Sequence, residues 1–392
     1  MDKFVINGPS KVKGLVNVSG SKNAALPILA ATLLFDKPVE IKNLPNVKDI
    51  ETMLNLLKSL GSKIIISNDK KSVKIINSKK IKTYASYSLV KTMRAGILVL
   101  GPLVSKYKKA TVSMPGGCNL GTRPINFHLN ALKKMNMSYK IKKGYVHAFV
   151  KTKLNGKKIK FPKISVGATE NLIIASTLSN GVTVLKNCAI EPEVKDLVNF
   201  LNLAGANLNW IGKRTLQIKG VNNLKSISYS IIGDRIETGT WCVLAALSEG
   251  KLKIKGFNPK LIQTELNLLK KIGTKIKCNN HEIEIKGSKN IKNINLTTKE
   301  YPSFPTDMQA QFMVLLCKAN GRSIIKENIF ENRFMHVAEL NRMGAKIKTK
   351  GNKAFIEGNT NFKPAELMAT DLRASVSLIL AALTAKGKTV IN

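Results

Sequence analysis

The sequence predicts an α/β protein of two similar domains, and the main reason is an internal repeat of about 70 residues. Six segments share one plan, in which a polar start leads into an apolar helix, a turn and a short strand-forming stretch. In five of them a second helix follows, with Leu at helical spacing, and strand-forming residues come after it. Six units that each read helix, strand, helix and strands, grouped in threes, give two α/β domains of similar build.

The first helix of each unit is an apolar run of buried-helix length that follows polar residues. The six runs are "SGSKNAALPILAATLL" from residue 19, "VKTMRAGILVLGPLV" from 90, "GATENLIIASTL" from 167, "DRIETGTWCVLAAL" from 234, "PTDMQAQFMVLLC" from 305 and "TDLRASVSLILAAL" from 370. The turns that end them lie near Asp36, Lys108, Gly181, Gly250, Gly321 and Gly387. This regular spacing places one strand-forming stretch after every first helix.

The second helices end at residues that suit a left-handed C-cap, as glycine does best. These residues are Gly61, Asn136, Gly205, Gly273 and Gly344. The 392-residue sequence ends before a sixth cap would be reached. We therefore expect a truncated sixth repeat that exposes apolar surface on Leu378, Ile379 and Leu383.

The domain boundaries follow from the grouping of the repeats. Residues 22–232 are expected to form the first domain of three repeats. Residues 1–21 read as a strand pair without a helix, and they most simply complete the last domain. The second domain is thus expected to be discontinuous, with residues 1–21 and 233–392.

The composition indicates a globular protein of the cytoplasm. No apolar run approaches the ~18–20 residues that span a bilayer, and the N-terminal residues have no signal-peptide pattern. The five cysteines at 118, 188, 242, 278 and 317 form no CxxC pair, as expected for a reduced protein. Neither a metal-ligand cluster nor a GxGxxG or P-loop motif is present, so no metal and no cofactor are expected. The sequence does not determine the oligomeric state, and a monomer is our expectation.

The net charge of +40 is extreme, and one interpretation is a nucleic-acid-binding surface. The charge comes from 56 Lys and only 8 Arg, spread over the whole length. This distribution favours drifted surface charge over a selected nucleic-acid site. A basic surface would still attract a small anionic substrate.

Charged and polar residues at the starts of the first helices indicate anion binding. Helix N-termini offer free N–H groups and a positive dipole end. Capping explains Ser, Asp and Thr at these starts, but Lys22, Arg94 and Arg373 oppose the dipole unless an anion lies there. Arg residues are rare in this chain, and five of the eight lie in these stretches or near them, at 94, 123, 235, 333 and 373. Their planar guanidinium groups suit carboxylates and phosphates.

These motifs together identify a family. The matching stretches include "SGSKNAALPILAATLL", "MPGGCNLGTRPINFHL", "KISVGAT", "EPEVKDLVNFL", "FPTDMQAQF", "ENRFMHVAELNRMGA" and "MATDLRAS", and they cover residues 19–377. The chain resembles the UDP-N-acetylglucosamine 1-carboxyvinyltransferases, enolpyruvyl transferases of the EPSP synthase superfamily. The thiol in "GGCNLG" favours this family over the EPSP synthases. The resemblance implies the two-domain enolpyruvyl transferase fold, with three βαβαββ-type repeats in each domain. It also implies the first committed step of peptidoglycan synthesis.

The resemblance also implies a role for each matching residue. The reaction joins phosphoenolpyruvate to the sugar 3-hydroxyl and releases phosphate, with Cys118 as general acid, Asp307 as base for the hydroxyl and Lys22 as a catalytic cation. Cys118 is also the thiol that forms covalent adducts and that fosfomycin alkylates. Phosphoenolpyruvate is expected at Lys22, Asn23, Arg123 and Arg373. UDP-N-acetylglucosamine is expected at Arg94, Arg123, Pro124, Ile125, Asn126, Phe127, Lys163, Ile164, Ser165, Val166, Asp307 and Ile329.

Several alternatives remain open at this stage. Cys118 is otherwise a small turn residue, Asp307 an ordinary cap, and His128 either a loop-orienting or a structural residue. Cys242 and Cys317 lie on apolar helix faces and are expected in the core, whereas Glu191, Asp234 and Asp371 are either cleft carboxylates or structural.

The sequence also departs from the family in two places. Asn126 replaces the usual Asp, and about thirty residues with a further phosphoenolpyruvate-binding arginine have no counterpart here. A truncated relative that binds UDP-sugar without turnover is therefore the alternative function, and a basic nucleic-acid-binding protein is a less favoured one.

Overall fold

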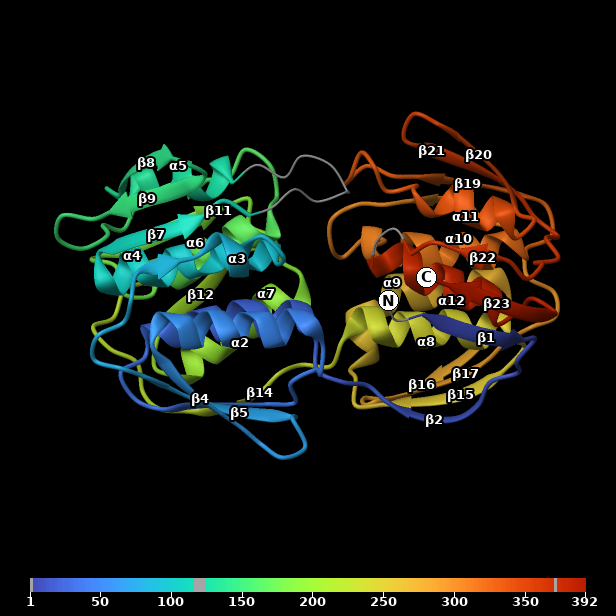
Figure 1. Cartoon of the computed structure of the whole chain (residues 1–392), viewed down its shortest axis with the longest axis horizontal. Coiled ribbons are helices and arrows are strands. Elements are labelled where there is room, and N and C mark those ends of the chain that lie inside the picture. Colours follow the sequence, from blue (N-terminus) through green and yellow to red (C-terminus); the bar gives the residue numbers. More distant parts are fainter. Residues whose placement is uncertain (1–2, 116–124, 370–371) are drawn as a thin grey trace. The chain divides into compact units, whose positions relative to one another are not determined.

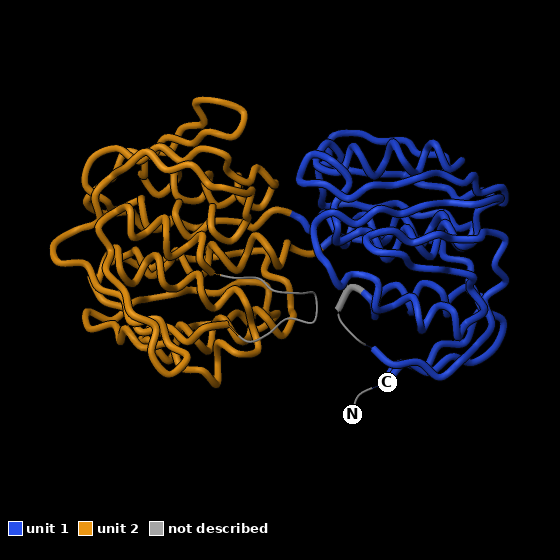
Figure 2. Tube along the Cα trace, turned by 90° about the horizontal axis from the view of Figure 1, so that it is seen from above, with its two compact units in different colours: residues 1–18, 119–121, 233–392 blue, residues 19–118, 122–232 orange. Residues whose placement is uncertain are grey.

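The computed structural model describes residues 3–115, 125–369 and 372–392, and these residues form two compact units (Figure 1). Unit 1 contains the described residues of Met1–Val18 and Gly233–Asn392, and unit 2 contains those of Ser19–Cys118 and Thr122–Ile232 (Figure 2). Each unit has a hydrophobic core of its own. Helices and mixed sheets alternate along both units, so the predicted α/β class is confirmed.

The described part of unit 2 contains three four-stranded sheets with one common plan. A short strand lies parallel to the first long strand, which pairs antiparallel with the next, and that strand pairs antiparallel with the last. In spatial order the sheets are β14 (Ser228–Ser230), β3 (Val39–Lys42), β5 (Ser72–Asn77), β4 (Ser62–Ile66); β6 (Tyr84–Ala85), β7 (Lys109–Ser113), β9 (Tyr145–Phe149), β8 (Ser138–Lys142); and β10 (Lys158–Lys160), β11 (Val182–Lys186), β13 (Thr215–Lys219), β12 (Asn207–Gly212).

The helices of unit 2 are of two kinds. Some are buried on all sides and lie in the interior, as α6 does, which is buried from Ala168 to Ser176. Others, such as α2, bury one stripe of side chains and leave charged residues exposed. The helices are α1 (Lys22–Ala31), α2 (Lys48–Leu60), α3 (Tyr87–Val90), α4 (Leu100–Tyr107), α5 (Asn126–Lys134), α6 (Val166–Ser176) and α7 (Pro192–Leu203), with the 3-10 helices η1 (Thr32–Leu34) and η2 (Arg94–Val99).

Unit 1 repeats this construction. Two sheets follow the plan of unit 2, and a third has its outer strand from the start of the chain. The sheets are β16 (Lys275–Cys278), β17 (Glu282–Lys286), β15 (Lys251–Lys255), β2 (Lys13–Asn17); β18 (Leu296–Thr297), β19 (Arg322–Lys326), β21 (Lys353–Glu357), β20 (Lys346–Lys350); and β1 (Phe4–Gly8), β23 (Gly387–Ile391), β22 (Glu366–Leu367). The helices are α8 (Arg235–Leu247), η3 (Pro259–Ile262), α9 (Gln263–Ile272), η4 (Thr306–Met308), α10 (Gln309–Cys317), α11 (His336–Arg342) and α12 (Leu372–Ala382).

The first strand of the chain pairs with the last. β1 runs antiparallel to β23, with Phe4 opposite Ile391, whereas β2 runs parallel to β15. Beside β1 lies α12, where Leu378 is fully buried and Ile379 and Leu383 pack against the core. The expectation that these three side chains are exposed is therefore wrong, because α10, α11 and β1 cover α12.

The predicted ends of the second helices are confirmed. All five residues have a positive φ, which is the left-handed conformation that a C-cap requires. The angles are 109° at Gly61, 68° at Asn136, 92° at Gly205, 112° at Gly273 and 91° at Gly344. Each chain reversal thus begins where the sequence pattern places it.

Candidate active site

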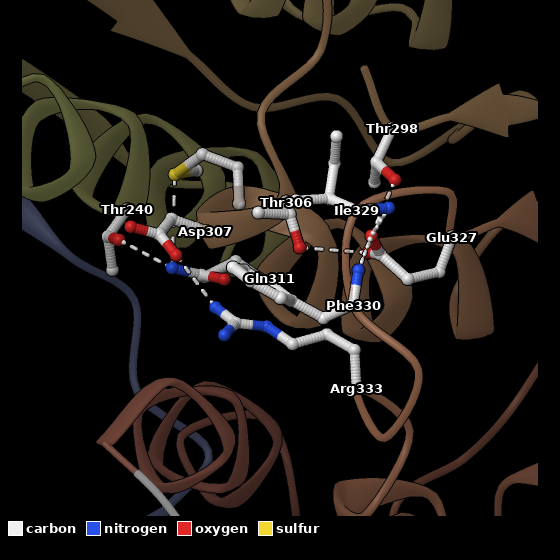
Figure 3. A network of polar contacts seen from close by, with 10 residues as sticks. Thr240, Thr298, Thr306, Asp307, Gln311, Glu327, Ile329, Phe330 and Arg333 are labelled. Carbon is white, nitrogen blue, oxygen red and sulfur yellow. Dashed lines mark hydrogen bonds and ion pairs between the residues drawn. The ribbon is translucent and has the colours of Figure 1, made fainter. Parts of the chain in front are cut away.

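Asp307 lies in unit 1, in the short helix η4 that leads into α10. The N-cap positions of these helices are Pro305 and Met308, and neither makes a side-chain cap hydrogen bond. Instead, Arg333 Nη2 lies 2.8 Å from Asp307 Oδ1 (Figure 3). The Arg333 side chain is only 3% exposed, whereas that of Asp307 is 26% exposed. Asp307 is therefore not an ordinary cap, and it presents a part-exposed carboxylate oriented by a buried arginine.

Ile329 belongs to the same network of polar contacts as Asp307. Its backbone N–H donates to Glu327 Oε1 over 2.8 Å, and the Thr306 hydroxyl donates to Glu327 Oε2 over 2.9 Å (Figure 3). Ile329 itself is half-buried in the loop after β19. The structure thus brings together two residues that the family resemblance assigned to the nucleotide-sugar.

Lys22 is the first residue of α1 in unit 2. Its Nζ lies 2.8 Å from Oδ2 of Asp49, which is in the first turn of α2. The two side chains are 21% and 35% exposed. The cation at this helix start therefore has a protein anion beside it, which corrects the expectation that only a bound anion could balance it. Asn23 follows in the same turn and is half-buried.

Arg94 begins η2, and its charge acts on a buried histidine of α5. Burial, together with the positive charge of Arg94, lowers the pKa of His128 to about 3. His128 Nδ1 lies 3.0 Å from Asn171 Nδ2, and the same amide group donates to the Ile97 carbonyl over 3.2 Å. A neutral imidazole that accepts this hydrogen bond fits a structural role for His128.

The segment Lys163–Val166 leads into the N-terminus of α6. Ser165 is the N-cap, and its side chain accepts a hydrogen bond from the Ala168 N–H over 3.4 Å. Lys163 and Val166 are exposed and Ile164 is half-buried. An exposed cation beside a helix N-terminus is a favourable place for a phosphate group.

The start of α5 carries the remaining described residues that were assigned to the nucleotide. Ile125 is buried in the core, Asn126 is exposed and Phe127 is half-buried. Of these three residues, Asn126 therefore offers the most accessible side chain.

Two further carboxylates differ in their surroundings. Asp234 caps α8 and accepts hydrogen bonds from the N–H groups of Ile236 and Glu237, over 2.7 and 3.1 Å. Glu191 lies buried at the start of α7 and close to Glu170. Burial, with the charges of Glu193 and Glu191, raises the pKa of Glu170 well above its ordinary value. Capping accounts for Asp234, whereas Glu191 belongs to a buried acidic group.

The described cysteines are poor nucleophiles. Cys188, Cys242 and Cys317 are buried, as predicted for the last two. Burial raises the pKa of the Cys188 and Cys317 thiols to about 12 and also raises that of Cys242. Cys278 is exposed on β16, and partial burial of its thiol raises the pKa. Thiol chemistry at neutral pH is therefore not expected from these four.

Some predicted site residues lie outside the described residues. They are Cys118, Arg123, Pro124 and Asp371. Arg373 belongs to α12, but its side chain is not among those described. Among the described residues, no three His, Cys, Asp or Glu side chains are grouped as metal ligands are.

Three contacts of the candidate site residues were not predicted, and the first is the pair of Arg333 with Asp307. Asp49 is the partner of Lys22, and Glu327 connects Ile329 with Thr306. In the sequence, Asp49 stands near the start of a helix, in "NVKDIETML". An acidic residue is common there because it interacts favourably with the positive end of the helix dipole, so the sequence does not point to Lys22 as its partner. Glu327 stands only two residues before Ile329, yet nothing in the repeat marks its side chain as buried.

Comparisons with known proteins identify the fold and the family. The EPSP synthase (3-phosphoshikimate 1-carboxyvinyltransferase) family model matches residues 6–392. Among solved structures, the enolpyruvyl transferase NikO from Streptomyces tendae has a TM-score of 0.90 at 23% identity, with 99% of this chain and 92% of that chain covered. EPSP synthase from Acinetobacter baumannii has a TM-score of 0.77 at 18% identity, with 100% and 93% covered. The predicted enolpyruvyl transferase fold is thus confirmed.

Curated relatives share far more of the sequence. UDP-N-acetylglucosamine 1-carboxyvinyltransferase from Pelagibacter ubique is 66% identical over 392 residues, which are 100% of this chain and 94% of the relative. The enzyme of the same name from Coxiella burnetii is 46% identical, with 100% and 90% covered. The family predicted from the motifs is confirmed: the chain belongs to the UDP-N-acetylglucosamine 1-carboxyvinyltransferases, which are transferases.

Proposed function

We propose that this chain transfers the enolpyruvyl group of phosphoenolpyruvate to the 3-hydroxyl of UDP-N-acetylglucosamine and releases phosphate, the first committed step of peptidoglycan synthesis. The observation that carries this proposal is the 66% identity to a relative of that name over all 392 residues. No observation favours either alternative, the inactive sugar-binding relative or the nucleic-acid-binding protein.

The chemistry requires two proton transfers. The sugar 3-hydroxyl loses its proton as its oxygen bonds to C2 of phosphoenolpyruvate, and C3 of the alkene gains a proton. The adduct then loses phosphate and a C3 proton, so that the alkene forms again. We assign the hydroxyl proton to Asp307, whose part-exposed carboxylate is oriented by Arg333, and the C3 proton to Cys118.

The anionic groups of both substrates require cations. We assign phosphoenolpyruvate to Lys22, Asn23, Arg123 and Arg373, and the diphosphate to the segment Lys163–Val166. The exposed Lys163 and the N-terminus of α6 support the second assignment. We assign Arg94 and the segment 123–127 to the nucleotide-sugar, and Ile329 to the sugar itself.

The proposal includes small-molecule substrates and a cytoplasmic site of action. No helix in the described parts of the chain is both long enough and apolar enough to cross a membrane. The substrates are a nucleotide-sugar and a phosphorylated acid, and a basic chain attracts such anions.

A phosphate-release assay tests the proposed function. We expect phosphate to form only when phosphoenolpyruvate and UDP-N-acetylglucosamine are both present, with the enolpyruvyl sugar as the second product by mass spectrometry. If calorimetry shows that the nucleotide-sugar binds while no phosphate forms, the chain is the inactive relative and the proposal is wrong.

A further inference from the structure

In unit 1, the carboxylate of Glu327 accepts hydrogen bonds from several segments of the chain. Glu327 follows β19, is 2% exposed and accepts four hydrogen bonds. The donors are the hydroxyls of Thr298 and Thr306, over 2.8 and 2.9 Å, and the N–H groups of Ile329 and Phe330, over 2.8 and 3.2 Å (Figure 3). We propose that Glu327 is a positioning residue, which fixes the loop 328–333 against Asp307; this inference rests on the proposed function.

The repeated sheets show which position Glu327 occupies. In four sheets the residue after the outer parallel strand donates its N–H to the last carbonyl of the neighbouring long strand. These backbone bonds run from Ile231 to Lys42 over 3.0 Å, from Phe161 to Lys186 over 3.0 Å, from Val18 to Lys255 over 2.9 Å and from Thr298 to Lys326 over 2.9 Å. The residues that follow the long strands, at 43, 187, 256 and 327, are therefore equivalent in the four sheets.

At two of these equivalent positions the residue is an asparagine with a local structural bond. Asn43 donates its amide to the Ile231 carbonyl over 2.8 Å, and Asn187 donates to the Phe161 carbonyl over 2.9 Å. Both asparagines have a positive φ, of 56° and 60°. The amide in each case closes the gap between two adjacent strand ends and reaches no further along the chain.

Glu327 departs from this pattern in the direction of its hydrogen bonds. Its carboxylate can only accept, and the equivalent partner is the hydroxyl of Thr298 rather than a carbonyl. Because a carboxylate stands here in place of an amide, it can also accept hydrogen bonds from the Thr306 hydroxyl and from the N–H groups of Ile329 and Phe330. Of the other three equivalent residues, the two asparagines bond only to the adjacent strand end, and Gly256 has no side chain. Glu327 is the one of these four residues that bonds to further segments of the chain, and a functional constraint is expected where one copy of a repeat departs from the others in this way.

The contacts close into a ring that contains the proposed base. Arg333 pairs with Asp307, and its guanidinium lies 5.4 Å from the centre of the Phe330 ring. The Phe330 N–H donates to Glu327, and Glu327 accepts from Thr306, the neighbour of Asp307 in the chain. Asp307 is thus held from both sides, by Arg333 and through Thr306, and Glu327 joins the two sides (Figure 3).

Two substitutions at position 327 separate positioning from charge. Glu327→Ala removes all four acceptor contacts. Glu327→Gln keeps the shape, its amide oxygen replaces Oε1 as acceptor for three donors, and its NH2 group can donate to the Thr306 hydroxyl. Glu282→Ala is the matched control, because Glu282 is a mostly buried glutamate of β17 that pairs with Lys253, outside the network of Figure 3.

Kinetics of phosphate release provide the main test. We expect Glu327→Ala to lower kcat by about 100-fold, the cost of a displacement of roughly 1 Å at the reacting groups, and to raise KM for the nucleotide-sugar. Glu327→Gln should recover most of kcat, and Glu282→Ala should keep it. If folded Glu327→Ala has a kcat within about twofold of the unaltered chain, or if Gln fails to restore any of the loss, the proposal is wrong.

A second variant covers the case in which Glu327→Ala does not fold. Thr306→Val removes only the hydroxyl that joins η4 to Glu327 and keeps the three other contacts. We expect about a tenfold lower kcat and a modestly lower melting temperature in a chain that still folds, since one hydrogen bond to a buried carboxylate is lost. An unchanged kcat in this variant overturns the proposal.

Hydrogen exchange separates this inference from the proposed function. If the unaltered chain releases no phosphate, the proposed function is wrong. The exchange rates of the Ile329 and Phe330 backbone amides then still test whether Glu327 fixes the loop. We expect both amides to exchange at least tenfold faster in Glu327→Ala than in Glu282→Ala. Equal exchange in the two variants overturns the role of Glu327 in fixing the loop.

Discussion

Arg333 Nη2 lies 2.8 Å from Oδ1 of Asp307, so the carboxylate proposed as base is oriented by a cation that is almost fully buried. The pair joins the loop after β19 to η4, the short helix that leads into α10. It therefore has two roles that substitutions can separate, one in holding these elements together and one in the reaction.

Substitution of Asp307 should separate catalysis from stability. Asp307→Asn keeps an oxygen for Arg333 but loses the base and the negative charge, and we expect turnover to fall by about 100- to 10,000-fold with a smaller loss of stability than in Asp307→Ala. Asp307→Ala leaves the buried Arg333 charge without any acceptor from this residue, which should cost about 3 kcal/mol or more. Phosphate release and urea unfolding measure the two effects, and near-normal turnover in Asp307→Asn would remove Asp307 from the proposed mechanism.

Asp49 should affect catalysis more than stability. Its pair with Lys22 is partly exposed, so Asp49→Asn is expected to change the free energy of unfolding by less than about 1 kcal/mol. Because Lys22 loses its orienting partner, kcat/KM for phosphoenolpyruvate should fall roughly tenfold, and Lys22→Ala should lose far more. Glu51→Gln in the exposed pair with Lys48 of the same helix is the control. A kcat/KM for Asp49→Asn that equals the control contradicts this role.

Fosfomycin should label a single thiol. We expect one added mass on Cys118, promoted by the nucleotide-sugar, and none in Cys118→Ser. The three buried thiols have a raised pKa, and so has the exposed Cys278. Cys278→Ser is therefore expected to label like the unaltered chain, and peptide mass spectrometry locates the adduct. An adduct on any other cysteine would argue against Cys118 as the reactive thiol.

His128 should make stability fall as the pH is lowered. Its pKa is about 3 in the folded chain, below the ordinary value of 6.5, so the unfolded chain binds a proton between these values and the folded chain does not. Lowering the pH from 7 to 5 should then remove about 2 kcal/mol of stability through this group. His128→Gln lacks this loss, and urea unfolding at both pH values measures the difference. Parallel pH profiles would exclude this contribution.

Much of the fold can be predicted from the sequence because the residues that end the second helices recur at the same place in the repeat. The residues predicted to end the second helices, such as Gly61 and Asn136, do adopt left-handed conformations. Local backbone preference decides these positions, and a periodic pattern repeats the signal several times. The pairing of β1 with β23 is different, because it joins residues from almost the two ends of the chain.

The candidate site was less predictable, because its side chains meet through packing. Lys22 was identified from its place at a helix start, but its partner Asp49 stands 27 residues away on another helix. Likewise, "ENIFENRF" contains two glutamates, and the sequence alone does not tell that Glu327 is buried and hydrogen-bonded while Glu331 is exposed. Leu378 was wrongly expected at the surface because its cover comes from elements far along the chain.

The pairing of β1 with β23 also sets an order of events during synthesis. At roughly 5–20 residues per second, the ribosome needs about 20 to 80 seconds to make the strand that β1 requires. All described residues of unit 2 lie between residues 19 and 232, so its sheets can form in the meantime. β1 has only five residues and is preceded by Lys3, and a short edge strand next to a lysine limits premature association. In the nascent chain β1 therefore stays unpaired until β23 has been made.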